Sequence, residues 1–100
     1  MKLTNECHRA VTVEDQCGFH MLAAQRVARV ANHFKSALFV SSLRHCANAT
    51  DIFSLLMLAA MFGSVLQLHA YGEDAEAALD EVARLISPGI EIYSDELVEV

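Results

Sequence analysis

Two spacings of apolar residues alternate along this chain of 100 residues, and their order limits the folds that it can adopt. Segments that alternate apolar and polar residues are typical of half-buried strands, whereas apolar residues at steps of three and four indicate amphipathic helices. These patterns predict strands at residues 7–13, 37–43, about 45–47 and 64–71. They predict helices at residues 21–34, 52–62 and 75–86. The order β-α-β-β-α-β-α predicts an α+β domain with helices packed on one face of a mainly antiparallel sheet.

Residues that prefer helix ends mark the boundaries of the second helix and of the domain. Asp51 suits the N-cap of the second helix, and Gly63 is a natural helix stop. Pro88 punctuates the chain after the last helix. We therefore divide the chain into a domain at residues 1–87 and an acidic C-terminal extension at residues 88–100. For that extension the sequence leaves open an edge strand, docking on the domain, or a free tail.

Charge and hydropathy exclude two classes of partner. The 13 acidic against 7 basic residues give a net charge of −6, which argues against a nucleic-acid groove. The longest apolar stretch, at residues 55–62, is far shorter than the roughly 20 residues of a membrane-spanning helix, and no signal-peptide pattern opens the chain. We expect a cytoplasmic monomer.

The apolar share of 54% exceeds what a core of this size needs and predicts a partner-binding face.

The cysteines and most of the histidines suggest neither a metal site nor a cofactor. Cys7, Cys17 and Cys46 are odd in number and widely spaced, so we expect reduced, mostly buried thiols. Four histidines lack metal-ligand spacing and are expected to be solvated or structural: His8, His33, His45 and His69.

The fifth histidine lies at the predicted start of a helix, directly after Gly18 and Phe19. Unpaired N–H groups and the positive end of the helix dipole favour an anion at such a position. His20 could there carry a phosphoryl group. The simpler alternative is an exposed loop histidine without a special role.

Several stretches, together with the order of elements, resemble a known family. In the first half they are Val11-Thr12-Val13, Gly18-Phe19-His20, Ala23 and Ala31-Asn32-His33-Phe34-Lys35-Ser36. In the second half they are Asn48-Ala49-Thr50-Asp51-Ile52, Leu55, Met57, Leu58, Gly63 and the run from Tyr71 to Leu79. From about Arg9 to Ile86 the chain resembles the histidine-containing phosphocarrier protein (HPr) of the bacterial phosphotransferase system, as a divergent member.

The resemblance implies both a fold and an activity. The fold is an open-faced β-sandwich of four antiparallel strands with three helices on one face. The activity is a phosphoryl relay in sugar transport, by a carrier rather than a stand-alone enzyme. The carrier accepts the phosphoryl group from Enzyme I, which phosphoenolpyruvate charges, and passes it to enzyme IIA proteins. His20 matches the family's acceptor, whose reactive atom is Nδ1.

The loop after His20 departs from the family pattern. The family reads Gly-Leu-His-Ala-Arg-Pro-Ala-Ala, so Leu22 stands in place of the arginine and Ala23 in place of the proline. A leucine cannot pair with phosphoryl oxygens, which leaves the backbone N–H groups of Met21 and Leu22 to hold the phosphate. An alternative function is therefore an HPr-like regulatory or protein-binding module that has lost efficient phosphoryl transfer.

Asp51 is the second departure, because many Gram-positive members carry there a serine that a regulatory kinase phosphorylates. A carboxylate offers no hydroxyl for this modification, so that regulation is expected to be absent. Asp51 is either a plain helix N-cap or a partial mimic of the phosphoserine charge.

An apolar patch is expected beside His20. Leu22 falls on the solvent side of the first helix, and a contiguous apolar patch usually marks an interface. In the family the second helix lies next to the active site and contacts partners. The predicted partner-binding residues are Leu22, Ile52, Phe53 and Leu56. The predicted core residues of the second helix are Leu55, Leu58, Ala59 and Phe62.

Overall fold

The computed structural model describes residues 6–43, 45–58 and 60–87, and it confirms the α+β class and the predicted order of elements. The strands are β1 (Glu6–Thr12), β2 (Ala37–Ser41), β3 (Cys46–Asn48) and β4 (Val65–Tyr71). The helices are α1 (Met21–His33), α2 (Ile52–Leu56) and α3 (Ala75–Ile86). The predicted C-terminal extension lies outside the described residues.

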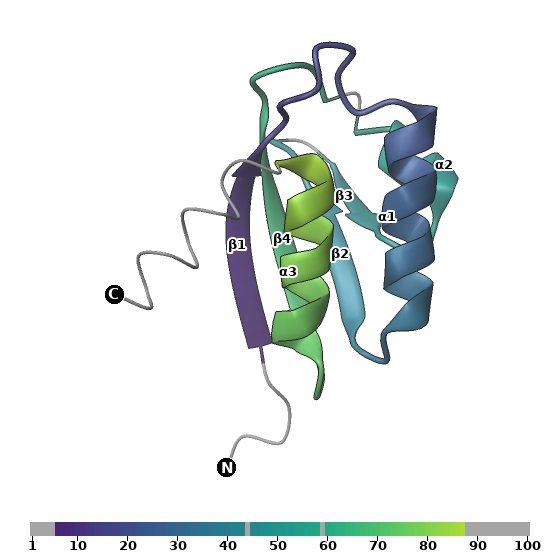
Figure 1. The fold of residues 1–100 in the computed structure, drawn as a ribbon, viewed down its shortest axis with the longest axis vertical. Coiled ribbons are helices and arrows are strands. Elements are labelled where there is room, and N and C mark those ends of the chain that lie inside the picture. The colour runs from purple at the N-terminus through teal and green to yellow at the C-terminus, as the bar shows by residue number, and fades with distance from the viewer. Residues whose placement is uncertain (1–5, 44, 59, 88–100) are drawn as a thin grey trace.

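The four strands form one antiparallel sheet in the order β1-β4-β2-β3. Its register places Leu66 of β4 opposite Val11 of β1, and Leu68 of β4 opposite Val40 of β2. Figure 1 shows α1 and α3 side by side on one face of the sheet, with α2 next to α1. Because the helices cover one face only, the predicted open-faced sandwich is confirmed.

The core lies between the sheet and the helices, where the predicted apolar positions meet. Leu66, Leu68 and Ala70 of β4 are buried, as their alternation predicted. The buried positions of α1 are Ala24, Val27, Ala28 and Ala31. The buried positions of α3 are Ala75, Ala78, Leu79, Val82, Ala83 and Ile86. The two periodicities in the sequence thus converge on one core.

The prediction for the second helix was too long. We expected it to reach residue 62, but α2 ends at Leu56 and Phe62 is 61% exposed rather than buried. The peptide groups beyond α2 bond to another segment instead: Ala60 O accepts from Phe19 N at 2.9 Å, and Gly63 N donates to Val13 O at 2.9 Å. These tertiary hydrogen bonds override helix propensity. Ala59 lies outside the described residues.

The prediction of mostly buried cysteines was also wrong. Cys17 and Cys46 are exposed, and Cys7 is partly buried. Cys17 lies in the loop between β1 and α1, and Cys46 begins the short strand β3 at the sheet edge, where little packs over it. Within the part of the chain that the structure describes, no helix combines the length and the apolar character that crossing a membrane requires.

A carboxylate fastens the start of α3 to the junction between α1 and β2. Asp74 accepts hydrogen bonds from Lys35 N at 3.0 Å, from Ser36 N at 2.9 Å and from the Ser36 hydroxyl. The Ser36 hydroxyl, followed by the Lys35 N–H, holds the pKa of Asp74 below its usual range. The preceding turn is tight as well, since a Cβ on Gly72 would lie 2.5 Å from Ser36 Oγ.

Candidate functional site

His20 is the N-cap residue of α1, and its imidazole folds back onto the first turn. Its backbone is extended, with φ −102° and ψ −175°, and its Nδ1 accepts a hydrogen bond from Leu22 N at 3.2 Å. An amide N–H can only donate, so Nδ1 carries a lone pair rather than a proton. The nitrogen that faces the helix N-terminus is therefore the nucleophilic one.

The opposite ring nitrogen faces a carboxylate. His20 Nε2 lies 3.0 Å from Asp15 Oδ2. Because Nδ1 is an acceptor, the neutral imidazole carries its proton on Nε2 and donates it to Asp15. Asp15 thus selects the tautomer that leaves Nδ1 free to react, and it faces any positive charge that the ring gains.

The loop before α1 holds Asp15 in place. The second carboxylate oxygen, Oδ1, accepts from Cys17 N at 2.8 Å, and the main-chain oxygen accepts from Gly18 N at 2.8 Å. The Cys17 N–H, followed by the His20 side chain, lowers the pKa of Asp15. The carboxylate therefore stays ionised to a lower pH than an ordinary aspartate does.

Gly18 allows this loop to lie directly on the segment after α2. Its φ of +80° is in the left-handed region, and a Cβ would lie 2.8 Å from Ala60 O. The next residue, Phe19, is buried and donates its N–H to the same carbonyl oxygen. The glycine and the phenylalanine that precede His20 in the sequence thus have structural roles that fix its position.

A small hollow of about 160 Å³ opens beside His20. Its polar lining comes from Asp15, His20 and Arg26, and its apolar lining includes Leu22 and Ile86. The His20 side chain is 35% exposed, so it is partly enclosed and still reachable from solvent. The hollow is large enough for a small anionic group.

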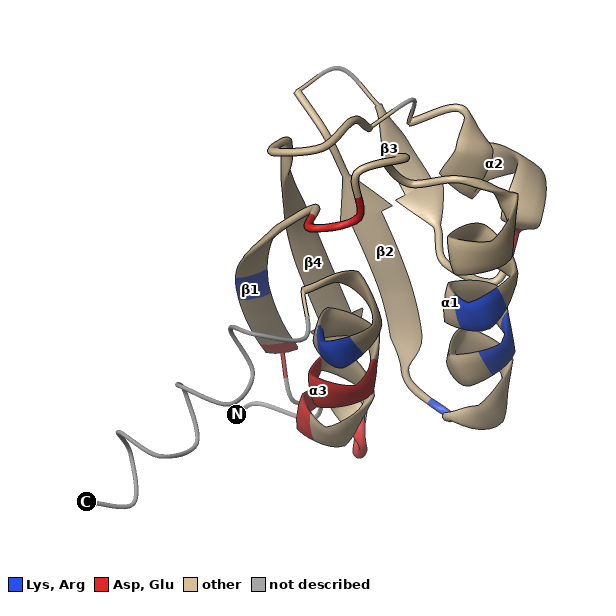
Figure 2. Ribbon diagram, turned by 45° about the horizontal axis from the view of Figure 1, so that its top comes forward, with Lys and Arg blue, Asp and Glu red and all other residues tan. Residues whose placement is uncertain are grey.

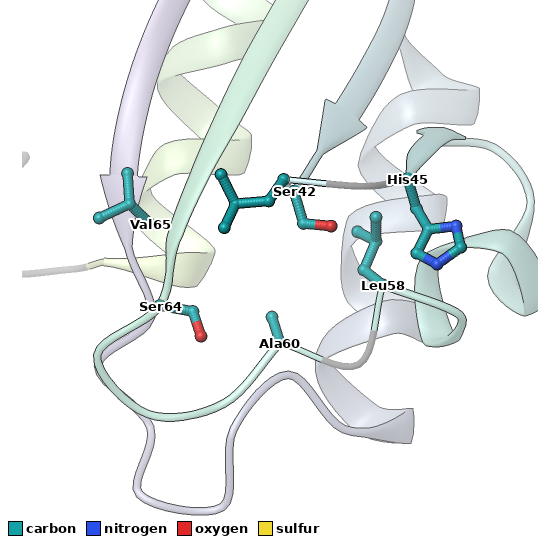
Figure 3. Close-up of a pocket in the computed structure, with 7 residues that line it drawn as sticks. Ser42, His45, Leu58, Ala60, Ser64 and Val65 are labelled. Carbon is teal, nitrogen blue, oxygen red and sulfur yellow. The ribbon is translucent and has the colours of Figure 1, made fainter.

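A larger open hollow of about 520 Å³ is lined in part by Leu58 and Ala60, in the segment after α2. Ser42 and Ala60 lie on opposite sides of it, with Leu58 and His45 at one end and Val65 at the other (Figure 3). Its lining residues, all within the described ranges, include no carboxylate, lysine or arginine. This hollow thus lacks the charged side chains that line the smaller hollow beside His20.

The predicted partner-binding residues differ in exposure. Leu22 and Phe53 are exposed at 48% and 76%, whereas Ile52 and Leu56 are half-buried against the core. Sequence reasoning missed three further exposed apolar residues between Phe53 and Gly63, which are Met57, Met61 and Phe62. It missed Met61 and Phe62 because it placed them in a helix.

Asp51 caps α2, as the sequence predicted. Its Oδ1 accepts from Phe53 N at 3.1 Å and from Ser54 N at 3.3 Å, and its Oδ2 accepts from Ser54 Oγ at 2.9 Å. The Ser54 side chain, followed by the Ser54 N–H, lowers the pKa of Asp51. The carboxylate is thus engaged within its own helix.

Two polar residues of the site were not singled out from the sequence. Asp15 falls between the predicted strand at residues 7–13 and the predicted helix at residues 21–34, and Arg26 falls inside that helix without an assigned role. The spacing Asp-x-x-Gly before a histidine was an available signal for Asp15, because such a carboxylate caps its own turn and ends beside the next helix. For Arg26 the signal was its position one turn after Leu22.

The fold and the site together describe a small α+β domain with a partly exposed imidazole at a helix N-terminus. The family model described as "PTS HPr component phosphorylation site" matches residues 7–87, and the chain belongs to this family of phosphocarriers of the phosphotransferase system. It is similar to the phosphocarrier protein NPr of Shewanella violacea, with 33% identity over 78% of this chain and 86% of that protein.

Further similarities agree with this assignment. The phosphocarrier protein HPr of Neisseria meningitidis is 29% identical over 79% of this chain and 89% of its own length. The crystal structure of a phosphocarrier protein HPr from Bacillus anthracis superposes with a TM-score of 0.78 at 27% identity, covering 82% of this chain and 98% of that one. The sequence-based assignment to the HPr family is confirmed.

Proposed function

We propose that His20 Nδ1 accepts a phosphoryl group from Enzyme I and passes it to enzyme IIA proteins, in the cytoplasm. The observation that carries this proposal is the orientation of the ring: Nδ1 accepts from Leu22 N at the start of α1, while Nε2 faces Asp15. Neither a purely structural histidine nor a metal ligand requires this arrangement.

In the transfer step the Nδ1 lone pair forms the new phosphorus–nitrogen bond. The bond between phosphorus and the donor breaks, and its electron pair leaves with the donor. The proton on Nε2 stays in its hydrogen bond to Asp15, whose negative charge offsets the positive charge that the ring gains. The reverse sequence, with the acceptor as the attacking group, discharges the carrier.

The first turn of α1 receives the phosphoryl oxygens. In the unphosphorylated protein the Leu22 N–H points at the Nδ1 lone pair. Once that lone pair is used in the new bond, the Leu22 N–H is released to bind a phosphoryl oxygen. Met21 supplies the preceding N–H, and both groups lie at the positive end of the helix dipole.

Partners dock on the apolar surface next to this site. Leu22 and Phe53 form its exposed part, and Ile52 and Leu56 support it from α2. Because α2 lies beside α1 (Figure 1), a partner that covers this surface also covers His20. At this surface Asp51 caps α2. Its carboxylate offers no hydroxyl that a regulatory kinase could phosphorylate.

The proposal is tested by incubating the protein with Enzyme I and labelled phosphoenolpyruvate. We expect one acid-labile, alkali-stable label per chain, which is absent from His20→Ala and moves to an added enzyme IIA. His33→Ala, which removes a different histidine of the same helix, should be labelled normally. Absence of label at every Enzyme I concentration would favour the alternative, a binding module without transfer.

A further inference from the structure

We propose that Arg26 supplies the cation for the phosphoryl group on His20, in place of the side chain at position 22. This proposal rests on the proposed function of His20 and adds a catalytic residue to that site. Leu22 cannot neutralise a phosphoryl group, and Asp15 adds a further negative charge beside it. A site that holds both anions needs a cation.

The small hollow beside His20 brings that cation into place. Among the described residues that line it, Arg26 is the one permanently charged base. His20 and Asp15 line the same space, so a phosphoryl group bound to Nδ1 enters a volume that the Arg26 side chain borders. The volume of about 160 Å³ accommodates such a group together with water.

Helix geometry directs Arg26 toward this space. Arg26 follows Leu22 by four residues, which is about 40° around the helix and about 6 Å along it. Side chains on a helix lean toward its N-terminus, and an arginine is long enough to span one turn. The guanidinium of Arg26 can therefore occupy the region above Leu22 that an arginine at position 22 would fill.

Arg26 is also available for this role. The side chain is exposed, and no carboxylate of the described residues forms an ion pair with it. By contrast, Arg9 pairs with Asp80. Figure 2 shows basic segments part-way along α1 and an acidic segment in the loop that leads from β1 to this helix.

The test uses phosphoramidate, a small phosphoryl donor, alongside Enzyme I. Because phosphoramidate needs no docking surface, it separates catalysis from partner binding. We expect Arg26→Gln to slow phosphorylation of His20 about 10- to 100-fold with both donors. Arg29→Gln, which removes the same charge from the next exposed turn of α1, should stay within about twofold of the wild type with phosphoramidate.

Two further readouts distinguish direct contact from a structural role. The ³¹P titration of phosphorylated Arg26→Gln should give a higher pKa for the phosphoryl group than the wild type, because the neighbouring cation is lost. The double variant Leu22→Arg/Arg26→Gln should regain most of the lost rate. Equal rates and equal phosphoryl pKa values in Arg26→Gln and the wild type would overturn the role of Arg26 alone. A wild type that neither donor phosphorylates would instead overturn the function of His20.

Discussion

The imidazole of His20 and the carboxylate of Asp15 are joined by a hydrogen bond of 3.0 Å between Nε2 and Oδ2. This bond fixes the neutral tautomer, because Nδ1 on the other side of the ring accepts from a backbone N–H. The lone pair on Nδ1 is thus held in place by a residue five positions earlier in the loop.

Asp15→Asn should slow phosphorylation of His20 at least about tenfold. The amide NH₂ group would face Nε2 and would favour the tautomer with the proton on Nδ1, which removes the nucleophilic lone pair. The rate of His20 phosphorylation should fall by a similar factor with phosphoramidate and with Enzyme I as the donor. Glu73→Gln, an equal loss of charge at an exposed position, is the control. An unchanged rate in Asp15→Asn would show that Asp15 does not set the tautomer.

Gly18→Ala should destabilise the domain more than Gly63→Ala. Both glycines have positive φ, +80° and +87°, which costs an alanine about 1–2 kcal/mol. Only at Gly18 does the new Cβ also meet a neighbour, Ala60 O at 2.8 Å, whereas at Gly63 nothing lies within 4 Å. Urea unfolding measures both free energies. Equal losses of unfolding free energy in the two variants would mean that the loop around Gly18 moves away from Ala60 without a cost in stability.

Phe53→Lys should weaken binding of Enzyme I about tenfold or more and leave phosphorylation by phosphoramidate unchanged. The side chain is 76% exposed on α2, so its loss affects the docking surface rather than the core. Leu43→Lys, at a fully exposed leucine between β2 and β3, is the matched control. Isothermal titration calorimetry checks both. Equal affinities for the two variants would place the interface elsewhere.

Asp74→Asn should lower the free energy of unfolding more at pH 7 than at pH 3. The pKa of Asp74 is lower in the folded chain than in the unfolded one, mainly because of the Ser36 hydroxyl. Its contribution to stability is therefore complete above the unfolded pKa of about 3.9 and is lost as the pH falls through the folded pKa. A difference from the wild type that is the same at both pH values would exclude this linkage.

The sequence predicted the fold well because each element carries its own signal. The alternation in β4 and the stripe of α3 placed Leu66, Leu68 and Leu79 in the core, where the structure has them. The length of α2 could not be predicted in this way. Its end depends on two hydrogen bonds, from Phe19 N to Ala60 O and from Gly63 N to Val13 O, which join residues about 40 to 50 positions apart in the chain.

The site was only partly predictable for a related reason. Gly18 and His20 come just before the first residue of α1, so the sequence around them shows the pattern of a helix start. The roles of Asp15 and Arg26 depend on side chains that converge across a turn and along a helix face. Each of these residues, taken alone in the sequence, has the pattern of an ordinary polar turn or a solvated helix surface.

The most direct test of the account is the ring atom that carries the phosphoryl group. After phosphorylation of ¹⁵N-histidine-labelled protein by Enzyme I and phosphoenolpyruvate, NMR should show phosphorus coupled to Nδ1 of His20, with the proton retained on Nε2. Phosphorus on Nε2, on another residue, or on no residue of the chain would contradict it.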